Sequence, residues 1–242
     1  MQIKAHCQTD VGLKRDSNQD SFLIDDDVGL YIVADGMGGH KGGEVASSMA
    51  VEITQSYFHE HGNSEDQHPR DQIFKAYKMA SQKIYDKSNF DTPELSGMGT
   101  TMVAVVARDD KLYIANVGDS RAYLFVENQL WQVTEDHSLL NEQIRAGLLT
   151  EEQSKYFAGK NVITRSVGFE RDVECDILER PMIVGEKYLV CSGGLSGLVS
   201  DQRICQLMKT FQDDELVGKC IEEAKLNGGD DNVTVMVLEV VN

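Results

Sequence analysis

Asp35 is the acidic residue whose surroundings in this sequence most favour chemistry. It follows the apolar run "YIVA", which is typical of a buried strand, and precedes a glycine-rich stretch from Gly36 to Gly39. Glycines let backbone carbonyl groups approach a ligand closely, and a buried carboxylate needs a compensating charge. A hard divalent cation bound by carboxylate and carbonyl oxygens is one solution. An Asx turn, or a cap for the helix that follows His40, is the alternative.

Three further aspartates lie in turns beside strand-like segments. Asp119 is part of "NVGDSR", and Asp230 and Asp231 are part of "NGGDDNVTV", just before an apolar run. Aspartate and glycine are ordinary turn residues, so each motif alone is compatible with a purely structural role. The same positions also suit oxygen ligands of a cation.

The motif "GLKRDSNQD" places Arg15 and Asp20 at the start of another strand. An arginine can bind a phosphate group by two parallel hydrogen bonds, or it can pair with a surface acid. The aspartates recur at strand ends, and the sequence has no Ser-His or Cys-His signature of nucleophilic catalysis. This combination favours aspartate-bound metal ions that activate water.

The composition restricts the classes of partner. The chain has 242 residues and a formal net charge of −17, which repels phosphate backbones and anionic lipid and disfavours binding to nucleic acid or to a membrane surface. The cysteines are odd in number and form no C-x-x-C pair, as expected for reduced thiols. No apolar run is long enough to cross a membrane. We therefore expect a cytoplasmic, monomeric protein.

Strands and helices alternate in blocks along the chain. Strand-like runs cover 2–6, 20–25, 29–34, 100–108, 111–117, 121–126, 129–133, 188–191 and 232–241, and helical runs cover 41–60, 68–88, 201–210 and 213–226. The order is strands, helix pair, strands, helix pair, strand. It predicts an α+β protein of one domain over 1–242, with sheets inside and helices outside.

Local patterns refine these elements. The connections "DD", "GDS" and "EN" between 100 and 133 are of hairpin length, so this block predicts an antiparallel meander. One apolar stripe on the second helix predicts a buried face, formed by Ile73, Tyr77, Ala80 and Ile84.

Residues 136–175 interrupt the pattern with a polar insertion. It predicts a polar helix near 138–146 and a second short helix from 151, because Thr150 and Gln153 have the spacing of a capping box. Such insertions are either surface decoration or lids over a site.

Six ordered motifs resemble those of the protein phosphatase 2C family, the metal-dependent Ser/Thr protein phosphatases, in its compact bacterial single-domain form. The motifs are "TDVGLKRDSNQDS", "YIVADGMGGHKGGEVAS", "GMGTT", "NVGDSRAYL", "TEDHS" and "GGDDNVTV". The resemblance covers nearly the whole chain. It implies a four-layer αββα sandwich of two antiparallel β-sheets flanked by helix pairs, with a mobile flap at 136–175. It also implies a centre of two Mg or Mn ions that hydrolyses phosphoserine and phosphothreonine on phosphorylated proteins.

The resemblance further implies metal ligands. Asp35 matches the acid that bridges both ions, and the carbonyl group of Gly36 matches a backbone ligand. Asp231 matches an acid on one of the ions, and Asp20 matches a carboxylate that holds a water molecule at the metals. Asp119 matches a ligand of a third, looser ion.

Arg15 matches the arginine that binds the substrate phosphate, so the resemblance implies catalytic roles for Arg15 and Asp35. His40 has a weaker claim to a role as general acid. In animal members, the histidine that acts as general acid directly follows Asp-Gly, where this chain has Met37. We expect His40 to be a solvated residue at the start of a helix.

Position 193 departs from the family pattern. Members usually have Ser-Asp-Gly where this chain has Ser192-Gly193-Gly194, and that aspartate matches a ligand of the same ion as Asp231. Ser192 is expected to point to the opposite face of its strand, so no neighbour replaces the carboxylate. We expect reduced metal occupancy and strongly impaired activity. The alternative is a weak or inactive phosphatase-fold module that binds phosphoproteins or other partners.

Overall fold

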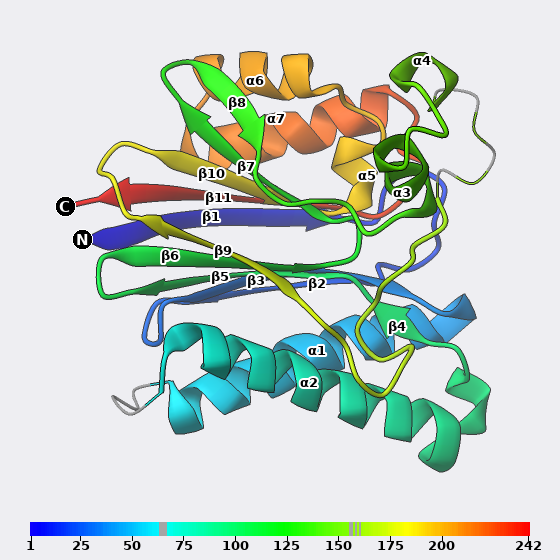
Figure 1. The fold of residues 1–242 in the computed structure, drawn as a ribbon. Helices are drawn as coiled ribbons and strands as arrows, with labels where there is room; N and C mark the ends of the chain where they lie inside the picture. The colour runs from blue at the N-terminus through cyan, green and yellow to red at the C-terminus, as the bar shows by residue number, and fades with distance from the viewer. Residues whose placement is uncertain (63–66, 155–156, 158, 160) are drawn as a thin grey trace.

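The computed structural model describes residues 1–62, 67–154, 157, 159 and 161–242, without the side chains of residues 40, 41 and 151. Two antiparallel sheets lie face to face, and helices cover their outer faces (Figure 1). One sheet has the strand order β1-β11-β10-β7-β8, and the other has the order β2-β3-β5-β6-β9, with β4 paired to β3. The predicted αββα sandwich is therefore confirmed.

The elements have the following bounds. The strands are β1 Gln2–Asp10, β2 Asp20–Asp25, β3 Leu30–Met37, β4 Gly99–Thr100, β5 Met102–Arg108, β6 Lys111–Val117, β7 Arg121–Val126, β8 Gln129–Gln132, β9 Asp176–Pro181, β10 Lys187–Cys191 and β11 Val233–Val241. The helices are α1 Gly39–His61, α2 Pro69–Asp86, α3 Leu139–Arg145, α4 Glu151–Ser154, α5 Gly193–Ser196, α6 Asp201–Thr210 and α7 Asp213–Leu226, with a π-turn η1 Lys87–Asp91 and a 3₁₀ turn η2 Pro93–Leu95.

Strand β3 shows how the sequence builds the layers. Successive side chains of a strand point to opposite faces. Leu30, Ile32 and Ala34 pack on the side of α1 and α2, whereas Tyr31 and Val33 pack between the two sheets. Both faces are covered, and for this reason the run is apolar throughout rather than alternating.

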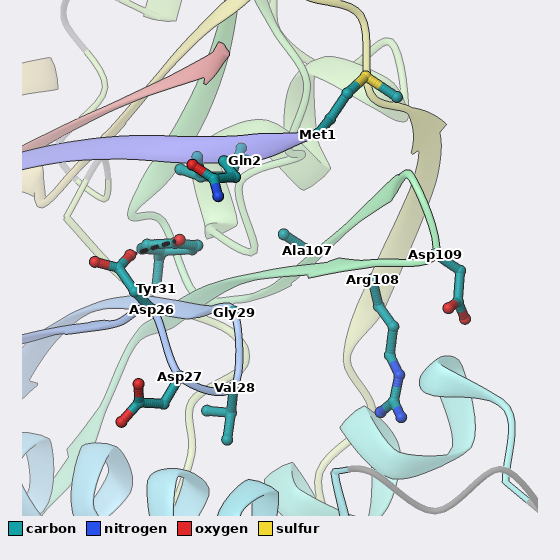
Figure 2. A pocket seen from close by; sticks show the side chains of 11 residues that line it. Met1, Gln2, Asp26, Asp27, Val28, Gly29, Tyr31, Ala107, Arg108 and Asp109 are labelled. Carbon is teal, nitrogen blue, oxygen red and sulfur yellow. Dashed lines mark hydrogen bonds between the residues drawn. The ribbon is translucent and has the colours of Figure 1, made fainter. Parts of the chain in front are cut away.

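The end of the sandwich near both chain termini contains a hollow of about 530 Å³. It lies between the start of β1 and the turn that joins β2 to β3 (Figure 2). Two of its polar side chains have partners: the Tyr31 hydroxyl donates to Asp26 at 2.9 Å, and Arg108 donates to Gln72 at 3.2 Å. Both of these side chains are thus engaged within the protein, and the lining also includes Asp27 and Asp109.

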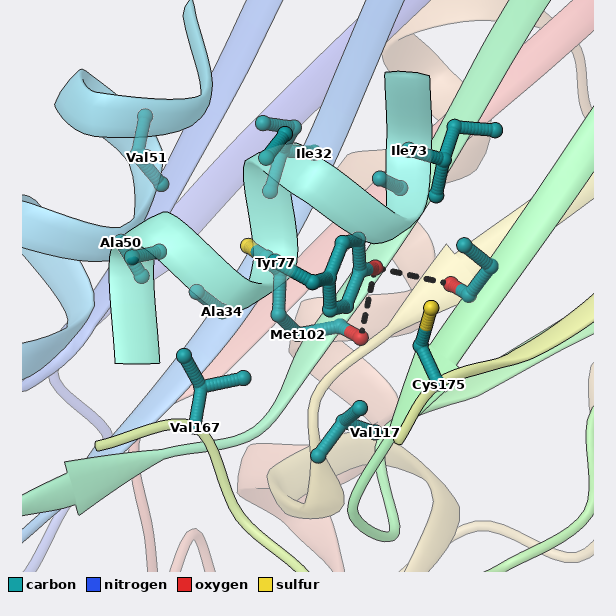
Figure 3. Packing of buried hydrophobic residues seen from close by; sticks show 14 of the residues in the cluster. Ile32, Ala34, Ala50, Val51, Ile73, Tyr77, Met102, Val117, Val167 and Cys175 are labelled. Carbon is teal, nitrogen blue, oxygen red and sulfur yellow. Dashed lines mark hydrogen bonds between the residues drawn. The ribbon is translucent and has the colours of Figure 1, made fainter. Parts of the chain in front are cut away.

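Helix α2 packs on its sheet through the predicted stripe. All four residues are fully buried: Ile73, Tyr77, Ala80 and Ile84. The Tyr77 hydroxyl donates to the carbonyl oxygens of Met102 at 3.2 Å and Ala115 at 3.1 Å (Figure 3). A buried phenol needs such partners, and these two fix the helix over β5 and β6.

The predicted meander is only partly correct. The hairpin turns at Asp109–Asp110 and Glu127–Asn128 are confirmed, and both residues of each turn have positive φ, as a type I′ turn requires. The predicted hairpin at "GDS" is wrong. Strand β6 pairs with β5 and β9, whereas β7 pairs with β10 and β8, so the chain crosses from one sheet to the other at 118–120.

The crossing follows from burial. Ile114 of β6 and Ala122 of β7 both belong to the apolar cluster between the sheets, so the two strands face each other rather than lie side by side. Sequence spacing alone does not distinguish these arrangements.

Strand β9 was not predicted, because "DILERP" is half polar and ends in proline, as suits an edge strand beside β6.

The polar insertion contains both predicted helices, α3 and α4. The capping box is confirmed: the Thr150 N–H donates to Oε1 of Gln153 at 2.9 Å, and the Gln153 N–H donates to Oγ1 of Thr150 at 3.3 Å. Part of the segment falls outside the described residues, and its mobility as a flap stays a prediction.

Within the described ranges, no helix is long and apolar enough to cross a membrane.

Candidate metal centre

Asp35 and Asp20 lie opposite each other at the polar end of the sandwich. Asp35 continues the series of Tyr31 and Val33 that points between the sheets. Asp20 is its partner in the antiparallel register of β2 and β3, and directly opposed residues share a face. The space between the sheets therefore changes from apolar to acidic at the end remote from the chain termini.

The carboxylate of Asp20 connects the two sheets. Its Oδ2 atom accepts hydrogen bonds from Ser192 Oγ at 2.8 Å and from Thr234 Oγ1 at 2.7 Å. Ser192 directly follows β10 and Thr234 lies on β11, and both strands belong to the other sheet. Its Oδ1 atom is buried and has no partner among the described residues. One oxygen of a side chain that is only 9% exposed is thus left for a further ligand.

The expectation that Ser192 points away from the centre is wrong. Tyr188 and Val190 of β10 face the space between the sheets, and the alternation carries Ser192 to the same side. The serine hydroxyl therefore reaches Asp20. It cannot supply the charge of a carboxylate, so the expectation that no neighbour replaces an acid at position 193 is unaffected.

Four carboxylates share this region, those of Asp20, Asp35, Asp119 and Asp231. Burial and the charges of Asp20, Asp119 and Asp231 raise the pKa of Asp35 well above its usual range. Burial, and then the charge of Asp231, raise the pKa of Asp20 to about 6. Burial, and then the charge of Asp136, raise the pKa of Asp119 to about 6. The structure thus brings together the acids predicted from separate motifs.

Arg15 is held at the rim of this cluster. Its guanidinium donates to Oδ2 of Asp231 at 2.9 Å, and both side chains are about half exposed. The loop that carries Arg15 is fastened by the buried amide of Asn232, which donates to the carbonyl oxygens of Val11 and Ser17 at 2.9 Å each. No role was predicted for Asn232, although it directly follows Asp231 in "GGDDN".

Gly36 lies where helix α1 meets the end of β3. A Cβ atom on Gly36 would come within 2.0 Å of the carbonyl oxygen of Gly43 and 2.6 Å of that of Gln19. Only glycine permits this approach of the two backbone segments. The role of its carbonyl group as a metal ligand stays a prediction. The side chain of His40 lies outside the described part of the chain.

Gly193 begins helix α5 beside Asp35. Its backbone N–H favours the charged form of the Asp35 carboxylate, and a Cβ atom on Gly193 would lie 3.5 Å from Asp35 Oδ2, an ordinary contact distance. By contrast, a Cβ atom on Gly194 would come within 1.9 Å of the carbonyl oxygen of Asn232. Position 193 therefore has room for a side chain directed at the acids, and position 194 has none.

Two residues that were quoted only within motifs hold the chain segment of Asp119. The backbone N–H of His137 donates to the carbonyl oxygen of Gly118 at 2.9 Å, and Nδ1 of His137 accepts the Gly118 N–H at 3.0 Å. Nε2 of His137 lies 3.1 Å from Oδ2 of Asp176 and 3.2 Å from Nη1 of Arg165. Thr101 contacts Ser120 on the other side of Asp119, with 2.6 Å between their hydroxyl oxygens.

The donor set fits a hard divalent cation. It consists of carboxylate oxygens, one of them buried and unpartnered, and burial, followed by mutual repulsion, raises the pKa of Asp20 and Asp35. Among the described residues, no three Asp, Glu, His or Cys side chains are already arranged as a complete ligand set. Asp231, for instance, is paired with Arg15. Bound cations would compensate the excess negative charge.

Comparison with known proteins identifies the family. The sequence profile described as protein phosphatase 2C matches residues 13–218. The serine/threonine phosphatase Stp of Listeria welshimeri is 36% identical over 246 residues, which cover 98% of this chain and 96% of that protein. The chain belongs to the protein phosphatase 2C family.

Solved structures of protein phosphatase 2C relatives share the fold described above. The serine/threonine phosphatase of S. agalactiae is 35% identical, with a TM-score of 0.91, and the match covers 98% of this chain and 99% of that one. The catalytic domain of the serine/threonine protein phosphatase PstP, in complex with two manganese ions, is 31% identical, with a TM-score of 0.88 and 99% coverage of both chains. The predicted family and enzyme class are thus confirmed.

Proposed function

We propose that this chain hydrolyses phosphoserine and phosphothreonine on proteins with the help of two bound Mg²⁺ or Mn²⁺ ions, and that Gly193 strongly impairs the reaction. The observation that carries this proposal is the convergence of Asp20, Asp35, Asp119 and Asp231 at one end of the sandwich, with Arg15 at its rim. A centre of this kind is suited to an anionic substrate once cations have reversed the local field.

The residues of the chain would divide the work as follows. Asp35 and Asp231 would hold the two ions, together with the carbonyl group of Gly36. Asp20 would direct a water molecule through its free Oδ1 atom, because its Oδ2 atom is already occupied by two hydroxyl groups. Bound divalent cations would lower the pKa of that water and neutralise charge on the phosphoryl oxygens.

Arg15 would bind the substrate phosphate. Its side chain is half exposed at the mouth of the centre, and its guanidinium group can form two parallel hydrogen bonds to a phosphate. It would have to leave Asp231 to do so, which becomes favourable once a cation has taken over that carboxylate. Asp119 would contribute to a third, weaker cation site.

Gly193 leaves the proposed centre without a carboxylate ligand at position 193. An aspartate there would begin 3.5 Å from Asp35 Oδ2, within reach of the same ions. Glycine leaves one anionic ligand fewer, so we expect weaker cation binding and a less acidic water molecule. This position also supports the second candidate function, a phosphatase-fold module that binds phosphoproteins with little turnover.

Hydrolysis of a phosphothreonine peptide, with Mn²⁺ and after its removal by a chelator, tests the proposal. We expect slow turnover that requires Mn²⁺ and disappears in Asp35→Asn. Binding of the peptide without turnover, even at millimolar Mn²⁺, would favour the second candidate.

We further propose that the protein acts as a monomer in the cytoplasm, with phosphorylated proteins as its partners.

A further inference from the structure

Thr101 contacts the backbone of Asp35 and the side chain of Ser120, which directly follows Asp119. It lies between β4 and β5 and is 1% exposed. Its Oγ1 atom accepts the backbone N–H of Asp35 at 3.0 Å, and its own N–H donates to the carbonyl oxygen of Asp35 at 2.9 Å. Thr101 thus pairs both backbone polar groups of Asp35, and the Asp35 carbonyl oxygen also accepts a hydrogen bond from Oγ1 of Thr100 at 2.9 Å.

The same hydroxyl group reaches the crossing between the two sheets. Oγ1 of Thr101 lies 2.6 Å from Oγ of Ser120, which is fully buried and directly follows Asp119. Gly118 also packs on Thr101, since a Cβ atom on Gly118 would come within 2.6 Å of the threonine Cβ. A single buried side chain therefore links the segments that carry Asp35 and Asp119.

We propose that Thr101 is a positioning residue that fixes the separation of the Asp35 and Asp119 carboxylates and thereby sets the affinity for divalent cations. The inference rests on the proposed function, because it takes both aspartates as cation ligands. Burial, and then the charges of the neighbouring acids, raises the pKa of Asp35, so these acids repel one another. Only a rigid, hydrogen-bonded support keeps such groups together before a cation arrives.

Thr101→Val tests this role, because it removes the hydroxyl group and keeps the shape of the side chain. Loss of a buried hydrogen-bond partner of this kind should weaken Mn²⁺ binding about tenfold or more. Thr101→Ser keeps the hydroxyl group and should restore the affinity. Electron paramagnetic resonance of free Mn²⁺ measures binding without reference to turnover.

Thr54→Val is the matched control. Thr54 is also fully buried, and its hydroxyl group contacts only the Met102 sulfur, at 3.8 Å, among the described partners. The same chemical change there should leave Mn²⁺ binding unchanged. If Thr101→Val fails to fold, Ser120→Ala replaces it, because it cuts the link to Asp119 while the Asp35 amide stays paired.

Equal Mn²⁺ affinities of Thr101→Val and Thr54→Val, or no restoration by Thr101→Ser, would overturn the inference. The proposed hydrolysis fails by a different result, namely a wild-type protein that binds Mn²⁺ without turning over a phosphopeptide. In that event, the comparison of Thr101→Val with Thr54→Val would still decide whether Thr101 positions the cation ligands.

Discussion

The backbone N–H of Gly193 lies beside the carboxylate of Asp35 and favours its charged form. A Cβ atom on Gly193 would lie 3.5 Å from Oδ2 of that carboxylate. Helix α5 therefore places its first residue beside an acid whose pKa is raised well above its usual range by burial and then by neighbouring carboxylates. The identity of residue 193 decides whether the proposed centre has one more anionic ligand.

The glycine pair at 193–194 gives a test of this local geometry. Gly194→Ala should destabilise the protein by about 1–3 kcal/mol, because its Cβ atom would come within 1.9 Å of the Asn232 carbonyl oxygen and the backbone would have to move. Gly193→Ala should change the free energy of unfolding by less than about 1 kcal/mol. Urea denaturation measures both values, and equal destabilisation by the two substitutions would contradict the described packing.

Arg15 and Lys14 give a matched pair at the rim. Each forms an ion pair with an aspartate of the opposite loop, Arg15 with Asp231 and Lys14 with Asp230. Arg15→Ala should lower kcat/KM for a phosphopeptide by roughly 10–100-fold, the range expected for loss of a charge-assisted hydrogen bond. Lys14→Ala should lower it by about twofold at most. Similar effects would mean that the arginine acts only through surface charge. The assay is best made in the Gly193→Asp background, where turnover should be measurable.

The raised pKa of Asp20, about 6, predicts a pH dependence of stability in metal-free protein. Folding favours the protonated carboxyl group, so its stabilisation is complete below the unfolded pKa near 4 and is lost as pH rises through about 6. Asp20→Asn cannot ionise. It should gain on the order of 2–3 kcal/mol relative to wild type between pH 4 and pH 7.

The exposed Asp16 serves as the control for this comparison. Asp16→Asn should track wild type at every pH, because its side chain lies in solvent. Denaturation with a chelator present, repeated at several pH values, gives all three curves. A difference between Asp20→Asn and wild type that stays constant with pH would contradict a raised pKa of Asp20, whether burial or the charge of Asp231 is its cause.

Much of the fold could be predicted because local signals agreed with the tertiary arrangement. Apolar stripes and positive-φ hairpin turns are determined within a few residues, as Tyr77 and the Asp109–Asp110 turn illustrate. The crossing at 118–120 could not be predicted, because its length also suits a hairpin. Only the requirement to bury Ile114 and Ala122 in the apolar cluster between the two sheets decides it.

In the candidate centre, too, some residues could be predicted from the sequence and others could not. Asp35 could be singled out from its own segment, because a carboxylate that ends a buried run is unusual. The partners of Asp20 could not, because Ser192 and Thr234 are common residues whose role arises only when two sheets meet. The expected direction of Ser192 was wrong for this reason: it depends on the phase of the alternation along β10.

Gly193→Asp gives the most direct test that a metal-dependent phosphatase centre exists here and is limited by residue 193. The measurement is turnover of a phosphothreonine peptide by wild type and by Gly193→Asp at matched Mn²⁺ concentrations, with Gly193→Ala as the control for side-chain volume. We predict an increase in kcat/KM of about tenfold or more for Gly193→Asp, equivalent to at least about 1.4 kcal/mol, and no increase for Gly193→Ala. A folded Gly193→Asp protein that turns over no faster than wild type would contradict the claim.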